Sequence, residues 1–395
     1  MAVIVEAVRT PRGKAKAGGG LSGASPTELL TSVMRAAIER AGVDPALIDD
    51  VVVGCATQTG EQGADIARTA SLLAGLSHET PGVTINRFCA SGLDAVNMAA
   101  AKVDAGDERL VLAGGVESVS RVPMFSDDGP LYSDPRVSRE IGFVHMGVAA
   151  DLVATLEGFS QEELDSYGVR SHHRAFSAWS RGVFDRSLVL VEGTTLAMDE
   201  HVRPNTSVAD MASMTPAFAN VGARGQDELA LSRYPEAGEI RHVHHRGNSP
   251  SLADGAGAVL VASDQTAKDL GLPRRGRVRS YANHGVDPVI MLTAGQEAVA
   301  KALDRAGMKV ADVERFEFAE AFAALCLKFE RDLDVEPERF NANGGTIAMG
   351  HAFGATGSIL VATLLDEMEA SDSTNGVVGI SGAAGMGVGT VIERV

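Results

Sequence analysis

A cysteine lies at the junction of a predicted strand and a predicted helix, a position that can make it a nucleophile. Residues 83–88 form a β-branched and aromatic run, and apolar residues recur at helical spacing over 93–103. Cys89 therefore precedes a helix N-terminus, where free N–H groups and the helix dipole stabilise a thiolate. A lone cysteine is more often a small buried thiol. Its position, rather than its residue type, favours chemistry here.

An internal repeat gives this cysteine a partner. Residues 37–51, AIERAGVDPALIDDV, align with residues 302–316, ALDRAGMKVADVERF, at an offset of 265. Each copy predicts a helix that ends at glycine, a short link and a strand. The same offset takes Cys89 to the stretch NANGGTIAMGHAFGATGS, which contains His351 and precedes a predicted helix. Two similar α/β halves packed together would bring both turns to one cleft.

A thiol that faces an imidazole is an activated nucleophile. The imidazole removes the thiol proton, or the two groups exist as thiolate and imidazolium. Taken alone, a histidine such as His351 is more often a capping or core residue. Its pairing with Cys89 through the repeat favours catalysis.

Composition limits the kind of protein. A chain of 395 residues with 45% hydrophobic and 22% charged residues predicts a globular protein with more than one packed unit. Three cysteines favour a reducing compartment, and neither a signal-like N-terminus nor a bilayer-spanning apolar run is evident. A net charge of −17 argues against nucleic-acid binding. We expect a cytoplasmic protein without membrane or nucleic-acid partners.

The pattern along the chain predicts two halves separated by an insertion. Strands are expected at 2–8, 51–54 and 109–112, helices at 25–41 and 65–74, and a mobile glycine- and lysine-rich loop after the first strand. The insertion contains a helix with a Ser160/Glu163 capping box. His242, His244 and His245 lie near its end, where a solvated turn is favoured over a metal or phosphate contact. No metal site is expected.

Several motifs in the right order resemble the thiolase family over essentially the whole chain. They are VRTPRGK, NRFCASGLDAV, AGGVESVSRVPM, HMGVAADLVA, GNSPSLADGAGAVL, GVDPVIM, EFAEAFAA and NANGGTIAMGHAFGATG, followed by the glycine-rich C-terminus. The resemblance implies a five-layered α-β-α-β-α fold of two duplicated halves with an inserted loop domain. The expected division is 1–118 with 248–265 for the first half, 119–247 for the loop domain with the CoA and acyl pocket, and 266–395 for the second half. The motifs NRFCASGL and SRVPM are closer to those of 3-ketoacyl-CoA thiolases of fatty acid β-oxidation than to those of the biosynthetic type.

The resemblance also implies roles for individual residues. Cys89 would take the acyl group as a thioester, His351 would activate it and help form one oxyanion hole, and the N–H groups of Cys89 and Ala383 would form a second. Ser381 occupies the position of the family's second acid/base. The residues expected to line the CoA and acyl pocket are His145, Met146, Ser249, Pro250, Ser251, Met291, Ala319 and Phe322.

Three residues depart from the family pattern. The second catalytic cysteine is Ser381, whose hydroxyl is much less acidic than a thiol. The asparagine of the N-E-A-F motif is Ala319, which removes a group that holds the water of an oxyanion hole. The proline after the histidine is Ala352, a milder change. Cys326 lies within an apolar helical pattern and is expected in the core.

The resulting prediction is an acyltransferase that cleaves a 3-ketoacyl-CoA with CoA through a Cys89 acyl-enzyme. Altered chemistry, such as thioester hydrolysis or another acyl transfer, and a non-catalytic acyl-CoA-binding subunit remain alternatives. CoA is expected as a co-substrate, with no permanently bound cofactor, and the resemblance implies a homodimer or homotetramer.

Overall fold

Ten strands form one mixed sheet in the computed structural model, which describes all 395 residues. Neighbouring strands follow the order β4-β3-β5-β6-β1-β7-β10-β9-β8 across the sheet, and the short β2 also pairs with β6. Only two residue pairs join β1 to β7, so the sheet divides there into an N-terminal and a C-terminal half. The strands are β1 (Ala2–Arg9), β2 (Gly13–Lys14), β3 (Asp50–Gly54), β4 (Val83–Ile85), β5 (Leu110–Glu117), β6 (Ala253–Ser263), β7 (Gly276–Gly285), β8 (Arg315–Phe318), β9 (Asn375–Gly382) and β10 (Met386–Arg394).

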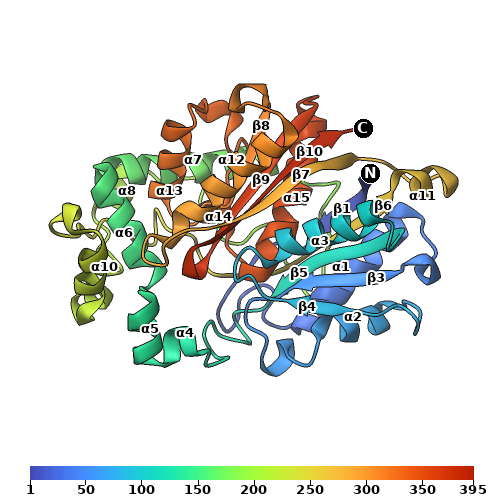
Figure 1. The fold of residues 1–395 in the computed structure, drawn as a ribbon, viewed down its shortest axis with the longest axis horizontal. Helices are drawn as coiled ribbons and strands as arrows, with labels where there is room; N and C mark the ends of the chain where they lie inside the picture. Colours follow the sequence, from blue (N-terminus) through green and yellow to red (C-terminus); the bar gives the residue numbers. More distant parts are fainter.

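The two halves of the sheet form two layers of a five-layered fold, as expected. Helices form the other three layers (Figure 1). The longer helices are α1 (Pro26–Ala41), α2 (Ile66–Ala74), α3 (Ser91–Ala105), α6 (Met146–Glu157), α7 (Gln161–Ser180), α12 (Ala294–Ala306), α13 (Ala323–Asp332) and α15 (Phe353–Ala370). Helices α3 and α15 pack on each other between the two halves of the sheet. The outer face of the N-terminal half is covered by α1 and α2, and that of the C-terminal half by α12.

The two halves repeat the same local structure at the offset expected from the sequence. Helix α1 ends at Gly42 (φ 68°), and α12 ends at Gly307 (φ 66°), both in the left-handed conformation that glycine adopts readily. A 3₁₀ turn follows each glycine, at Pro45–Leu47 and at Val310–Asp312. Strands β3 and β8 then begin 265 residues apart, as do β5 and β9. The predicted duplication is therefore a duplication of structure.

The chain between β5 and β6 forms a separate group of helices, seen at the left of Figure 1. Besides α6 and α7 it contains α4 (Pro130–Ser133), α5 (Pro135–Ile141), α8 (Val208–Ala212), α9 (Ala219–Val221) and α10 (Asp227–Arg233); α11 (Asp264–Asp269) and α14 (Thr346–Met349) lie further along the chain. The capping box between Ser160 and Glu163 begins α7 as predicted. No single helix is long and apolar enough to cross a membrane; only a pair bent by 119°, residues 135–157 with 161–180, meets that test together.

The segment after β1 is largely without regular structure, as predicted, but its start is buried and anchored. Arg9 and Arg12 are fully buried, and both contact the carboxylate of Asp199, at 2.9 and 3.3 Å. The guanidinium of Arg12 also donates to the carbonyl of Gly350, beside His351. Burial of charges is costly unless they are paired, so this ion cluster holds the segment in place.

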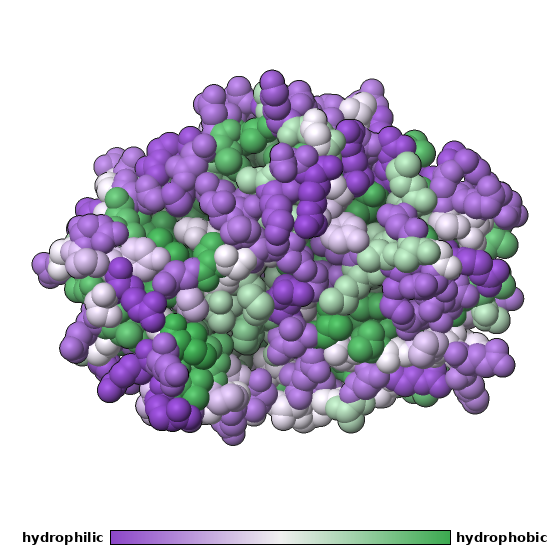
Figure 2. Space-filling view, viewed as in Figure 1, coloured by the Kyte–Doolittle hydropathy of each residue, from purple (hydrophilic) through white to green (hydrophobic).

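One edge of the sheet is left uncovered within the chain. Strand β4 ends the N-terminal half, where Val83 is 43% exposed and Met98 of the neighbouring α3 is 37% exposed. Figure 2 shows an apolar patch near β4, one of several on this face. An edge strand presents unpaired N–H and C=O groups that can pair with another chain.

Candidate active site

Cys89 lies in a braced turn between β4 and α3, as the sequence predicts, although the strand is shorter than expected. The hydroxyl of Ser91 accepts the N–H of Arg87 at 2.7 Å and donates to the carbonyl of Phe88 at 2.6 Å. Phe88 has a φ of 48°, which is rare for a residue other than glycine and is found where surrounding structure enforces it. The turn therefore presents the thiol in one fixed place.

His351 lies at the corresponding place in the second half, before α15. Its backbone N–H donates to the carbonyl of Ser251 at 2.7 Å, and its carbonyl accepts the N–H of Ala253 at 3.1 Å. Phe353, two residues later, has a φ of 29° and is related to Phe88 by the same offset of 265. His351 is thus held by the segment that leads into β6 as well as by its own turn.

Two glycines allow the helices behind these turns to approach closely. A Cβ on Gly92 would lie 2.5 Å from the carbonyl oxygen of Gly354, and one on Gly357 would lie 2.2 Å from the nitrogen of Leu93. The first turns of α3 and α15 are therefore in backbone contact. Because each reactive residue immediately precedes one of these turns, both residues reach the same cavity.

Cys89 and His351 line one cavity of about 290 Å³. Nine residues predicted from the sequence contribute to it: Cys89, His145, Met146, Ser249, Pro250, Phe322, His351, Ser381 and Ala383. Six more line it without having been predicted: Met124, Phe218, Leu252, Leu292, Ala321 and Phe353. Ten of the fifteen lining residues are hydrophobic, which suits an acyl group and a thioester better than a free acid.

Three predicted pocket residues lie outside this lining. Ser251 supplies the backbone carbonyl that binds the N–H of His351. Met291 is fully buried in the core of the C-terminal half. Ala319 is 1% exposed and bonds through its N–H to the carbonyl of Gly379. These residues support the cavity from behind.

The hydroxyl of Ser381 reaches the cavity but is engaged on both sides. It donates to the carbonyl of Leu292 at 2.6 Å and accepts the N–H of Gly295, in the first turn of α12, at 3.0 Å. Its proton is therefore directed at the protein backbone. A serine held in this way is poorly suited to deliver a proton to a substrate.

The environment keeps both reactive groups neutral near pH 7. Burial, followed by the negative charge of Glu117, raises the pKa of the Cys89 thiol to about 12. Burial, followed by the positive charge of Arg12, lowers the pKa of His351 to about 3. Burial and the charge of Glu117 therefore act against the thiolate that the position before a helix N-terminus predicts.

These shifts predict how the thiol reacts with a small alkylating agent. The thiolate is the reactive form, so the rate of iodoacetamide alkylation should rise about tenfold per pH unit without a plateau up to about pH 10. Cys55 and Cys326 are fully buried and should stay unmodified, which intact-mass measurement can verify. A plateau of the Cys89 rate above about pH 9 would instead indicate an unperturbed thiol, and a plateau between about pH 7 and 8 an activated one.

Glu117 is a site residue that the sequence reasoning did not single out. Its buried carboxylate, at the end of β5, accepts the N–H groups of Ala56, Thr57 and Gly354 at 2.9, 3.1 and 2.9 Å. It thereby ties a loop of the first half to the first turn of α15, next to both reactive residues. A carboxylate directly after the apolar run of β5 is the signal that could have identified it.

Thr356 is the hydrogen-bond partner that orients His351. Its Oγ1 lies 2.9 Å from Nδ1 of the imidazole, while Nε2 makes no hydrogen bond within the chain. When Nδ1 donates to the hydroxyl, Nε2 is free to take the thiol proton. When Nδ1 accepts from the hydroxyl, Nε2 carries a proton and can stabilise an oxyanion. A hydroxyl serves both states because it can donate or accept.

Replacing Thr356 by valine should therefore lower kcat more than it raises KM. A lost hydrogen bond to a charged imidazole costs about 1.5–3 kcal/mol, which corresponds to a loss of about tenfold to hundredfold in rate. The pH profile of kcat should shift as well, since the imidazolium loses its acceptor. Thr356→Ser keeps the hydroxyl and should retain most activity. Equal losses in the serine and valine variants would assign Thr356 to packing alone.

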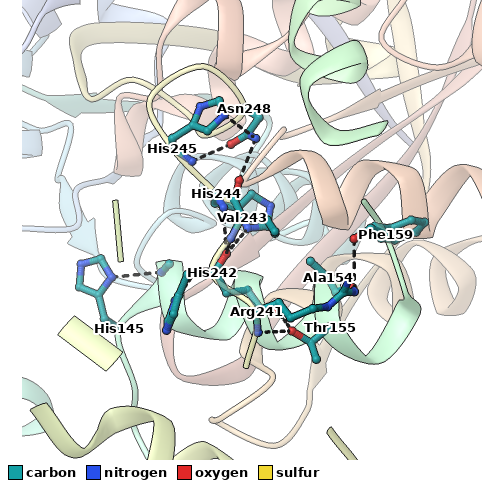
Figure 3. Close-up of polar contacts among 12 residues, drawn as sticks. His145, Ala154, Thr155, Phe159, Arg241, His242, Val243, His244, His245 and Asn248 are labelled. Atoms are coloured by element: carbon teal, nitrogen blue, oxygen red, sulfur yellow. Dashed lines mark hydrogen bonds and ion pairs between the residues drawn. The ribbon is translucent and has the colours of Figure 1, made fainter. Parts of the chain in front are cut away.

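The histidines near the end of the insertion are wrongly predicted as a solvated turn. His242 and His244 contact the buried carboxylate of Asp151, each at 2.8 Å, and His245 contacts Asp165 at 2.9 Å. Figure 3 shows this run continuing to Asn248, whose side chain accepts the N–H of His245. No group of three or more His, Cys, Asp or Glu side chains has the arrangement of a metal site.

These buried contacts support the cavity wall. The ring of His244 packs edge-on against Phe322, with centroids 5.3 Å apart, and Phe322 packs against Phe218 at 5.7 Å. Both phenylalanines line the cavity. The histidines therefore fix an aromatic wall through carboxylates of α6 and α7.

An apolar cavity that holds a thiol and an imidazole from two duplicated α/β halves defines an acyl-transfer enzyme with a cysteine nucleophile. Residues 2–224 match the family described as "Thiolase, N-terminal domain", and residues 272–394 match "Thiolase, C-terminal domain". The chain belongs to the thiolase family.

Named proteins resemble the chain over its full length. A 3-ketoacyl-CoA thiolase of Serratia proteamaculans is 39% identical over 406 residues, covering 100% of this chain and 99% of that protein. One of Colwellia psychrerythraea is 37% identical over 407 residues with the same coverage. The crystal structure of human mitochondrial 3-ketoacyl-CoA thiolase matches with a TM-score of 0.86 at 29% identity, covering 100% of this chain and 98% of that one.

Proposed function

We propose that this acyltransferase cleaves 3-ketoacyl-CoA with CoA, giving acetyl-CoA and a shortened acyl-CoA. The observation that carries the proposal is the single apolar cavity lined by Cys89, His351 and Ala383. The full-length relatives named as 3-ketoacyl-CoA thiolases support it. CoA acts in this reaction as a co-substrate.

The reaction divides into two acyl transfers. In the first, His351 takes the thiol proton, the sulfur of Cys89 attacks the 3-keto carbon, and the bond between carbons 2 and 3 breaks. Acetyl-CoA leaves as a carbanion that must gain a proton, and the acyl group remains on Cys89 as a thioester. In the second, the CoA thiol loses its proton and attacks this thioester, which releases acyl-CoA and restores the thiol of Cys89.

The backbone supplies the electrostatic part of the proposal. The N–H groups of Cys89 and Ala383 would stabilise the oxyanion that forms on the acyl-enzyme, and Nε2 of His351 would stabilise the oxyanion of the attacked ketone. Fixed donors of this kind cost no reorganisation during the reaction. The strained turns at Phe88 and Phe353 hold their neighbours in this arrangement.

A second candidate is thioester hydrolysis or another acyl transfer without a carbanion. The observation that favours it is the engaged hydroxyl of Ser381, which donates its proton to the carbonyl of Leu292. C–C cleavage needs a group that protonates the departing acetyl-CoA, whereas attack on a thioester needs only the nucleophile and its base.

Product analysis separates these functions. We expect acetoacetyl-CoA and a longer 3-ketoacyl-CoA to be consumed only when free CoA is added, with acetyl-CoA as a product. An acyl adduct on Cys89 should be detectable by intact mass when CoA is left out. Release of a free acid without added CoA would show that the chain hydrolyses thioesters and does not catalyse thiolysis. The absence of any adduct on Cys89 would leave acyl-CoA binding without catalysis as the function.

We further propose that two copies of the chain pair through β4. Its position at the sheet edge and the exposed Val83 and Met98 beside it support this pairing. Light scattering of the purified protein distinguishes a monomer, a dimer and a tetramer. A cytoplasmic location remains a prediction, supported by three free cysteines.

A further inference from the structure

A small, mostly apolar chamber opens beside the nucleophile, with Cys89 in its lining. It measures about 40 Å³, and nine of its eleven lining residues are hydrophobic. It shares Cys89, Met124, Met146, Phe353 and Ala383 with the main cavity. Ser381, Ser249 and His351 line only the main cavity. An acyl group on the sulfur can therefore extend into a mostly apolar space, in which Thr57 and Asp127 are the polar lining residues.

A much larger cavity adjoins this chamber and shares two lining residues with it. It measures about 380 Å³, and only three of its eight lining residues are hydrophobic. Phe125 and Tyr132 line both the chamber and the outer cavity. Their rings are 4.5 Å apart between centroids and tilted by 46°. The two rings are therefore the partition between an apolar chamber at the nucleophile and a more polar space beyond.

Contacts within residues 125–132 fix the positions of the two rings that form the partition. The hydroxyl of Tyr132 donates to the carboxylate of Asp127. Gly129 leaves room for that hydroxyl, because a Cβ there would lie 2.9 Å from it. Phe125 has a φ of 70°, an uncommon conformation for a residue other than glycine that aims its ring at Tyr132. The hydrogen bond of Tyr132 and the backbone conformation of Phe125 thus hold the two rings in this arrangement.

We propose that Phe125 and Tyr132 form the end wall of the acyl subsite and set the chain length that the enzyme accepts. The proposal rests on the acyl-enzyme of the proposed function. Short acyl groups on Cys89 fit the chamber, whereas longer chains must displace the two rings and enter a space lined by Asp128 and Gln226. Both displacement and entry into polar surroundings disfavour a hydrocarbon tail. The wild-type enzyme therefore acts preferentially on short-chain 3-ketoacyl-CoA.

Shortening either ring tests this wall, because space already exists behind it. In Tyr132→Ala and, separately, Phe125→Ala, the ratio of kcat/KM for 3-ketodecanoyl-CoA to that for acetoacetyl-CoA should rise at least about tenfold, a typical effect of a few added methylenes in a pocket. Tyr132→Phe keeps the ring and should stay within about threefold of wild type in this ratio. Phe176→Ala removes an aromatic ring that is 44% exposed on α7 and should leave the ratio unchanged.

Measurement of acylation separates the two proposals. Intact mass after incubation with acetyl-CoA and with decanoyl-CoA reports loading of Cys89 without the C–C step. Preferential acetyl loading in wild type, with decanoyl loading gained in both alanine variants, supports the wall. Unchanged ratios in both alanine variants of an enzyme that forms acyl adducts would overturn the wall alone. Failure of every thioester to acylate wild-type Cys89 would overturn the proposed function and the wall with it.

Discussion

Replacement of Cys89 by alanine is expected to abolish the acyl-enzyme and to lower kcat/KM by about four orders of magnitude or more, as for other residues that act as a catalytic unit. The reason is that no other thiol can reach the substrate. Cys55 and Cys326 are fully buried, and burial raises the pKa of both thiols well above the usual value. Intact mass after incubation with acetyl-CoA should show a single adduct in wild type and none in Cys89→Ala.

Cys326→Ala is the matched control. It removes a buried thiol from α13 that does not line the cavity, and should retain the adduct and most of the turnover. Its free energy of unfolding should fall modestly, because a small buried group is lost. An adduct that persists in Cys89→Ala and disappears in Cys326→Ala would contradict the assignment of the nucleophile.

The duplication made much of the fold predictable from the sequence. The glycines at 42 and 307 and the helix and strand on either side of each were recognised because local signals, a helix C-cap and an apolar run, occur twice at one offset. The location of Cys89 before α3 and of His351 before α15 followed from the same offset. Local signals and their repetition were sufficient for these features.

The pocket lining shows how side-chain direction limits such predictions. Met291 and Ser251 were expected to line the cavity, but their neighbours Leu292 and Leu252 do so instead. Successive side chains in extended or turning backbone point in different directions, so an error of one residue moves the side chain to the other side of the wall. Motif matching identifies the segment correctly without settling which residue faces inward.

Electrostatics and long-range packing could not be predicted from local sequence. Arg9 pairs with Asp199, 190 residues away, and this buried ion pair anchors the start of the expected loop. The raised pKa of Cys89 comes from burial and from Glu117, both consequences of the assembled halves. Likewise, the histidines at 242, 244 and 245 are buried only because α6 and α7 carry Asp151 and Asp165.

Replacement of Ser381 by cysteine is expected to raise the rate of thiolysis by about a hundredfold, the lower range for a positioned general acid or base. A thiol has a free pKa near 8.5, and it is a much weaker hydrogen-bond donor to the carbonyl of Leu292 than the present hydroxyl. The sulfur would therefore be freer to deliver a proton to departing acetyl-CoA and to take one from CoA.

The Ser381→Ala variant decides whether the present hydroxyl takes part at all. If its proton is committed to the backbone, as the 2.6 Å contact to Leu292 indicates, thiolysis in Ser381→Ala should stay within about threefold of wild type, because no acid is lost. Acyl transfer between acetyl-Cys89 and CoA should change little in Ser381→Ala, because the hydroxyl proton is already committed to the backbone. A cysteine variant no faster than wild type, together with a much slower alanine variant, would mean that the hydroxyl already serves as the proton donor despite its backbone contacts.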